Sequence, residues 1–297
     1  MIHINFRFKK YIIKYIKKYI LSLIIFCLII ISILIERKYC HNYKIVAISY
    51  ANEKFLKQLK INKLTAINIG KVDEYYSYNF DDIDLIFKKQ NEDILSRKRG
   101  NGYWLWKPYF ILKTFKERLN IGDYLIYTDS GIFYLDKAKK LINFMISINE
   151  DMWSFKLKVL EKSFSKRDAF ILLNAESPIY TDTFQYMAGI QIYKKSKFTE
   201  NFIEKLLKYS TDKRIITDDP NSQGLPNYNE FIDNRHDQTV LSILTKKVRF
   251  SNLIKNKIKA SDINNIQYNL MPKIFCIYRS LYFKSYYELR NKCNEIV

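Results

Sequence analysis

The residues with the clearest capacity for chemistry end a short apolar run at residues 124–127. The segment 122–131 reads GDYLIYTDSG, so Asp129 follows a strand-like run and precedes a glycine that permits a sharp turn. A buried strand that stops on a carboxylate places a charge at the mouth of a sheet, where Asp129 could hold a divalent metal on a diphosphate. An ordinary strand-to-turn junction, capped by Asp-Ser-Gly, explains the same residues.

A second group, at residues 97–109, combines cations, aromatic rings and two glycines. Tryptophan and tyrosine can stack on a base or a sugar ring, and arginine or lysine can neutralise phosphate. The alternative is that the two tryptophans pack in the core and that Pro108 begins a helix over 109–119. The candidates from this segment are Arg99, Trp104 and Lys107.

The third group is NRHDQTVLSIL at residues 234–244. The apolar run that follows is typical of a helix, so His236, Asp237 and Gln238 are expected at its N-terminus. An aspartate there also works as a simple cap, but a cap does not explain the neighbouring arginine, histidine and glutamine.

The elements needed to position these groups follow an α/β order. Strands are predicted at 44–50 and 65–69 with a helix at 51–64 between them, which is the start of an α/β nucleotide-binding unit. Neither a GxGxxG nor a GxxxxGKS motif occurs. Residues 183–193 read as a loop entering a strand, where the Ala-Gly step would let the backbone approach a ligand or would form a β-bulge. Further helices are expected at 81–87, 138–148 and 198–209, and the longest loop at 210–232.

Composition permits a large globular core and leaves a strong positive charge. The chain has 297 residues, 48% of them hydrophobic, and a formal charge of +20. Residues 1–44 carry +8 of that charge, and the +12 on the remainder suits a nucleotide diphosphate, an acidic glycan or anionic lipid. No basic run with interleaved aromatics resembles a nucleic-acid module, so no nucleic-acid partner is expected.

The N-terminal segment has the pattern of a membrane anchor. Residues 1–18 form a basic tail, and residues 19–35 contain no charge, at the short end of the length that spans a bilayer. Six basic residues precede the run and three follow it, which predicts a cytoplasmic N-terminus and a main domain outside the cytoplasm or in a lumen. A cleaved signal peptide is the rival, but the run is long and no small-x-small site follows it.

The four cysteines, at 27, 40, 276 and 293, have no CxxC spacing and support neither a zinc site nor a redox motif. A bridge between Cys276 and Cys293 is an alternative to free thiols.

Taken in order, RGNGYWLWKPY (99–109), GDYLIYTDSG (122–131), AGIQIYKKS (188–196) and NRHDQTVLSIL (234–244) resemble a family of nucleotide-diphospho-sugar glycosyltransferases with the GT-A fold. Each motif is weak alone, and the ordered set spans most of residues 44–250. The resemblance implies an α/β, Rossmann-like mixed sheet flanked by helices, with the catalytic domain at 44–297.

In GT-A enzymes a DxD motif holds Mn²⁺ or Mg²⁺ on the diphosphate, and Asp129 matches one of its carboxylates. The second acid is missing here, since Thr128, Ser130 and Gly131 flank it. The resemblance implies Asp237 and Gln238 as catalytic residues and Asp129 and His236 as metal ligands. The donor-binding residues it implies are Tyr50, Arg99, Trp104, Lys107, Tyr127, Asp129, Gln185 and Gly189.

The expected function is therefore a membrane-anchored, metal-assisted glycosyltransferase, a hexosyltransferase, moving a sugar from a nucleotide-diphosphate donor to a glycan, lipid-linked or protein acceptor. A non-catalytic glycan-binding or scaffold protein on the same fold is the alternative, motivated by the missing acid. A third hypothesis is a basic protein that binds membrane surfaces or nucleic acid.

Overall fold

A computed structural model describes residues 16–28, 30, 43–255 and 275–277. The chain divides into two compact units, residues 1–43 and 44–297. Within the first unit, residues 16–28 are helical. Among the described residues, no helix is both long and apolar enough to cross a bilayer; the predicted span at 19–35 lies partly outside them.

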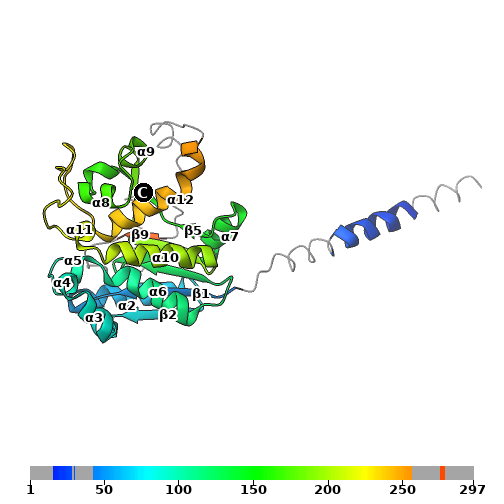
Figure 1. The fold of residues 1–297 in the computed structure, drawn as a ribbon. Helices are drawn as coiled ribbons and strands as arrows, with labels where there is room; N and C mark the ends of the chain where they lie inside the picture. Colours follow the sequence, from blue (N-terminus) through cyan, green and yellow to red (C-terminus); the bar gives the residue numbers. More distant parts are fainter. Residues whose placement is uncertain (1–15, 29, 31–42, 256–274, 278–297) are drawn as a thin grey trace, which may run out of the picture. The chain divides into compact units, whose positions relative to one another are not determined.

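The second unit is built on a five-stranded mixed sheet in the order β2-β1-β3-β8-β5 (Figure 1). β1 (Ile45–Tyr50) lies parallel to both β2 (Glu74–Tyr78) and β3 (Tyr124–Thr128). β8 (Ile190–Lys194) runs antiparallel to β3 and to β5 (Met152–Trp153). The predicted mixed α/β sheet flanked by helices is confirmed.

The central strands are buried on both faces, which is why they are nearly continuous apolar runs. In β3, Leu125 and Tyr127 join the apolar cluster on the α6 side, while Thr128 contacts α2 through the side chain of Asn62. Successive residues of a strand alternate between faces. The helices α2 (Leu56–Asn68) and α6 (Trp106–Arg118) therefore cover opposite faces of the sheet.

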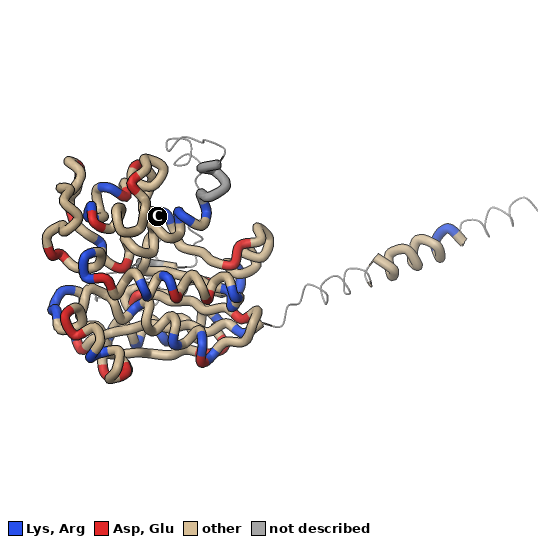
Figure 2. Tube along the Cα trace, viewed as in Figure 1, with Lys and Arg blue, Asp and Glu red and all other residues tan. Residues whose placement is uncertain are grey.

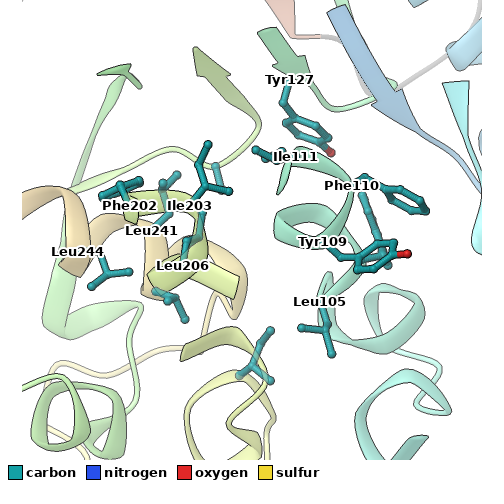
Figure 3. Close-up of a cluster of buried hydrophobic side chains, with 14 of the residues drawn as sticks. Leu105, Tyr109, Phe110, Ile111, Tyr127, Phe202, Ile203, Leu206, Leu241 and Leu244 are labelled. Carbon is teal, nitrogen blue, oxygen red and sulfur yellow. The ribbon is translucent and has the colours of Figure 1, made fainter. Parts of the chain in front are cut away.

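The main core lies on the α6 face. There α6 packs against α10 (Lys197–Ser210), which also contacts α12 (Asp237–Lys255). Figure 3 shows Phe110 and Ile111 of α6 below Tyr127 of β3, and Ile203 and Leu206 of α10 beside Leu241 of α12. Burial of these large side chains gives the domain most of its stability.

The remaining described elements are short and connect these layers. Two further two-stranded sheets pair β4 (Ile132–Tyr134) with β9 (Phe275–Ile277), and β6 (Lys156–Leu160) with β7 (Phe184–Tyr186). The helices are η1 (Glu53–Phe55), η2 (Phe80–Asp82), α3 (Leu85–Gln90), α4 (Glu92–Leu95), α5 (Gly100–Tyr103), α7 (Lys139–Ser147), η3 (Glu161–Ser163), α8 (Arg167–Leu172), α9 (Pro178–Thr181) and α11 (Lys213–Ile216).

One predicted element is wrong and a second is incomplete. Residues 65–69 are not a strand: α2 continues to Asn68, and its buried Thr65 accepts a hydrogen bond from the backbone N–H of Tyr134 in β4. The second strand of the domain is β2, which begins at Glu74. The strand predicted at the end of residues 183–193 is present as β8. Part of the segment predicted as a loop, Phe184–Tyr186, forms a further strand, β7, in a different sheet.

The helix predicted at 109–119 begins earlier, at Trp106, so Pro108 is its third residue and not its first. The choice between a Cys276–Cys293 bridge and free thiols stays open, because Cys293 lies outside the described residues. Cys27 is a free, exposed thiol.

Candidate functional site

A buried lysine lies between two carboxylates at the carboxyl edge of the sheet. The Nζ of Lys107 is 3.2 Å from Oδ1 of Asp129 and 2.8 Å from Oδ2 of Asp237. The side chain of Lys107 is only 4% exposed and that of Asp237 8%, whereas Asp129 is 45% exposed. The cluster therefore offers solvent one carboxylate that a buried cation holds in place.

Three elements deliver these residues. Asp129 follows the last residue of β3, Lys107 is the second residue of α6, and Asp237 is the first residue of α12. The N-termini of two helices thus converge on the end of a strand. Unpaired N–H groups and the helix dipole make such termini favourable for anions.

Burial and charge set the protonation states of the cluster. Burial lowers the pKa of Lys107, but the carboxylates of Asp129 and Asp237 outweigh it, so the pKa is raised and the ammonium stays charged. Burial raises the pKa of Asp237 to about 6, against the opposing effect of Lys107. Asp237 is thus a carboxylate at neutral pH, and it takes up a proton near pH 6.

The turn that carries Asp129 is held from both sides. The hydroxyl of Tyr127 donates to Oδ1 of Asp129 at 2.6 Å, and burial raises the pKa of Tyr127 well above its usual value, so it remains a donor. The backbone N–H of Asp129 donates to the carbonyl of Gly189 at 2.8 Å. A Cβ on Gly189 would lie 3.0 Å from Oδ2 of Asp129, so any larger residue here would push that carboxylate aside by a few tenths of an ångström.

Asn62 of α2, which belongs to none of the sequence motifs, supports the same turn. Its Nδ2 donates to the hydroxyl of Thr128 at 2.9 Å and to the carbonyls of Asp129 and Ile132. Its Oδ1 accepts from the hydroxyl of Tyr75. The clue in the sequence is that Asn62 lies between Leu59 and Ala66 on the buried stripe of a helix, where a polar residue needs a partner.

Gln238 and Gln185 lie beneath the cluster as a relay of hydrogen bonds. Oε1 of Gln238 accepts from the backbone N–H of Ala188, and its Nε2 donates to Oε1 of Gln185 at 2.7 Å. Gln185 is fully buried, and its own amide donates to Glu161. Gln185, predicted to bind the donor, therefore supports the Ala188–Gly189 step from below.

The relay ends in a sealed ion pair. Nζ of Lys246 is 2.6 Å from Oε2 of Glu161, and both side chains are 0% exposed. Lys246 also donates to the carbonyls of Tyr180 and Thr183, and Ser165 and Ser242 donate to Glu161. Both charged groups of this pair are therefore hydrogen-bonded to other groups of the protein.

Tyr50 belongs to an aromatic group beside the cluster. Its ring stacks on that of Trp106 with centroids 3.7 Å apart, and its hydroxyl accepts from the side-chain amide of Asn101. Nζ of Lys107 lies 5.9 Å from the ring centroid of Trp106 and 5.2 Å from that of Tyr127. The structure thus brings Tyr50, Lys107 and Tyr127, three of the predicted donor-binding residues, close to one another, with Trp106 between Tyr50 and Lys107.

The short element α5, before α6, is a left-handed turn and not a regular helix. Five successive residues, 100–104, have φ between 52° and 92°. A side chain in this region costs about 1–2 kcal/mol per residue, and Asn101, Tyr103 and Trp104 all bear one. Two hydrogen bonds hold the turn in place. Nε1 of Trp106 donates to the carbonyl of Gly100 at 2.9 Å, and the backbone N–H of Tyr103 donates to the carbonyl of Arg99.

Arg99, Trp104 and His236 form a separate group. Arg99 pairs with Asp218 at 3.0 Å and with Asp233 at 2.7 Å, both in the long segment between α11 and α12. The His236 ring stacks on Trp104, and its Nδ1 donates to the carbonyl of Ile216 at 2.7 Å. Burial lowers the pKa of His236 and keeps it neutral. Arg99 thus pairs with two acids of residues 218–233, and its role on a phosphate of the donor stays a prediction.

The side chains fit a metal site poorly. Among the described residues, no three His, Cys, Asp or Glu side chains gather closely enough to hold an ion. Asp237 is paired with Lys107. His236 donates through Nδ1 to a backbone carbonyl, and its Nε2 has no hydrogen-bond partner in the described part of the chain but faces Asp218, 3.8 Å away, rather than Asp129. Of the two predicted metal ligands, Asp129 is the one that solvent reaches.

No protein-family model and no curated protein matches this chain. Among solved structures, the galactosyltransferase LgtC, crystallised with donor and acceptor sugar analogues, is 12% identical with a TM-score of 0.44, covering 84% of this chain and 94% of LgtC. The bifunctional glycosyltransferase WbbM is 10% identical with a TM-score of 0.41, and mouse xyloside xylosyltransferase 1 is 9% identical with 0.39. Each covers 69% of this chain; the match spans 38% of WbbM and 82% of the mouse enzyme. At such low TM-scores these neighbours do not establish what this chain does.

Proposed function

We propose that this protein is a glycosyltransferase with the GT-A fold that uses a nucleotide-diphosphate sugar. The observation that carries the proposal is the cluster in which Lys107 joins an exposed Asp129 to a buried Asp237 at the carboxyl edge of the parallel strands. Ligands of open α/β sheets bind outside this edge. The four ordered motifs supply the residues that surround it.

The chemistry required is the breaking of the bond between the anomeric carbon and the diphosphate, with an acceptor oxygen taking its place. The departing diphosphate gains negative charge, which Lys107 and the N-termini of α6 and α12 would stabilise. A carboxylate near the anomeric carbon must take the acceptor's proton or stabilise positive charge on the sugar. With its pKa of about 6, Asp237 suits this role.

Asp129 would orient the donor through the oxygen that solvent reaches. Lys107 lies between it and Asp237 and lowers the repulsion between the two carboxylates and an incoming diphosphate. Since the side chains do not complete a metal site, this scheme routes no step through an ion. The prediction of Mn²⁺ or Mg²⁺ stays open to test, with Asp129 as its one accessible carboxylate ligand.

Residues 1–35 would hold the domain at a membrane, with the N-terminus in the cytoplasm. A glycan, lipid-linked or protein acceptor would suit that placement, and a hexose is the proposed sugar. These assignments rest on the charge pattern and the resemblance alone.

Calorimetry with UDP and GDP, each with and without Mn²⁺, followed by a hydrolysis screen of nucleotide sugars, tests the proposal. We expect binding of one nucleotide and hydrolysis of its sugar conjugate, both lost in Lys107→Met. Binding that needs Mn²⁺ would show that an ion contributes. If neither nucleotide binds the folded chain under any condition, the enzyme proposal fails and the non-catalytic glycan-binding alternative is favoured.

A further inference from the structure

Helix α2 has an inverted distribution of polar and apolar residues. Its buried face contains Gln58, Asn62 and Thr65, while Leu56, Leu64 and Ile67 are exposed. A helix on a sheet normally buries its apolar stripe and exposes its polar one. Asn62 and Thr65 are explained by the backbone that they support, at Asp129 and Tyr134. Nothing in the described part of the domain covers the exposed apolar residues.

Four lysines share the exposed side of this helix and of η1 before it. These are Lys54, Lys57, Lys60 and Lys63, and among the described residues none takes part in an ion pair. Elsewhere in the described domain, basic and acidic residues are interspersed (Figure 2) and many pair with one another. From Asn52 to Asn68 the single acidic residue is Glu53.

The spacing places both kinds of residue on one stripe. Leu56, Lys60, Lys63, Leu64 and Ile67 each lie three or four residues from another member of the set, which lines them up along one side of a helix. Phe55 precedes them, and the four apolar side chains are between 42% and 52% exposed. Apolar residues flanked by lysines along one side are typical of helices that lie in the interface of a bilayer.

We infer that the exposed face of η1 and α2 docks on an anionic lipid surface. Each lysine near such a surface favours binding by about fivefold, and half-exposed leucine, isoleucine and phenylalanine side chains can enter the headgroup layer. Charge alone would equally suit a polyphosphate or an acidic glycan, but the apolar residues between the lysines favour lipid.

This surface does not depend on the proposed reaction, but it would serve it. If residues 19–35 span the bilayer, the nine residues 36–44 can extend at most about 30 Å, so the domain cannot leave the membrane. The buried face of the same helix holds the turn of Asp129 through Asn62. A docked α2 would therefore set the cluster at a fixed height for acceptors in or near the membrane.

The test labels lysines of the full chain with an amine-reactive reagent and reads each by mass spectrometry. The chain is placed in nanodiscs of phosphatidylcholine alone or with added phosphatidylglycerol. We expect labelling of Lys54, Lys57, Lys60 and Lys63 to slow on the order of tenfold in the anionic discs only. Lys205 and Lys208, exposed on α10, are internal controls and should not change.

Two variants separate the contributions. In Lys57→Glu/Lys63→Glu, the remaining Lys54 and Lys60 should lose their protection, while Lys205→Glu/Lys208→Glu on α10 should leave it intact. Leu56→Ser/Leu64→Ser should weaken protection with the charges unchanged. Melting temperatures check that each variant folds.

Equal protection in neutral and anionic discs, or protection that the α10 variant removes as well, would overturn the inference. Soluble polyphosphate or heparin that protects as well as the anionic discs would show a polyanion surface instead. None of these readouts uses nucleotide or sugar, so a failed glycosyltransferase assay leaves the result intact.

Discussion

Two clusters in this domain are made from the same groups, a buried lysine and carboxylates, but differ in their access to solvent. Lys246 and Glu161 are sealed, and every charge is met by another side chain or a carbonyl. Lys107 is as deeply buried, yet one of its two carboxylates, Asp129, is 45% exposed. The sealed cluster therefore suits support, and the open one suits contact with a substrate.

The largest effect is expected from breaking the sealed pair. Lys246→Met would leave Glu161 charged and unpaired in the interior and should lower the free energy of unfolding by about 3–5 kcal/mol. Urea unfolding measures this value. Adding Glu161→Gln to Lys246→Met should recover part of the loss; a double variant as unstable as the single one would contradict the role of the pair.

Asp129→Asn tests the open cluster. It keeps the shape of the side chain but removes the charge, so we expect kcat/KM for the nucleotide sugar found in the screen to fall by about 100-fold or more. The melting temperature should stay within a few degrees, because the side chain is half exposed. Asp136→Asn, which changes an exposed surface ion pair, is the matched control, and an Asp129 variant as active as this control would remove Asp129 from the site.

The pH dependence of activity and of stability tests Asp237, the buried carboxyl group of the open cluster. The pKa of Asp237 is about 6, so activity that needs its carboxylate should fall about tenfold for each pH unit below 6. The folded pKa lies above the unfolded value of 3.8, so the stabilisation from protonating Asp237 is full below pH 3.8 and is lost as pH rises through 6.

Steady-state rates and thermal melts between pH 4 and 8 measure both effects. In Asp237→Asn, the fall in stability between pH 3.8 and 6 that comes from this carboxyl should be absent. An acidic limb of the rate profile centred near pH 4 would contradict the raised pKa.

Gly189→Ala is expected to have the smallest effect. The added methyl group would meet Oδ2 of Asp129 at 3.0 Å and push the carboxylate aside by a few tenths of an ångström. A displacement of this kind should lower kcat by about tenfold or less with little change in stability. Gly122→Ala, at a position with no atom within 4 Å but a positive φ, is the control: it should affect stability and not kcat.

The sequence was sufficient where a pattern is local. β1, β3, α10 and the start of α12 at Asp237 follow from apolar periodicity and from residues that end or begin elements. Residues 65–69 misled because threonine and isoleucine favour strands, while the tertiary contacts of Thr65 with Tyr134 and of Asn62 with Thr128 favour the helix.

For the site, the sequence identified Asp129, Lys107 and Asp237 but could not pair them. Lys107 and Asp237 are 130 residues apart, and no local rule selects that lysine rather than another of the chain's 50 basic residues. In the same way, the position of Arg99 favoured a phosphate ligand, and only the fold shows that Asp218 and Asp233 occupy its guanidinium.

The turn at residues 100–104 has the opposite hand to the regular helices described for this domain. Mirror-image amino acids prefer that hand, so a D-residue at position 101 would relieve the backbone cost, but it would also move the side-chain amide away from the hydroxyl of Tyr50. The two glycines of this turn adopt the left-handed conformation without the cost that an L side chain would add. A replacement of Gly100 would also need room against the indole of Trp104.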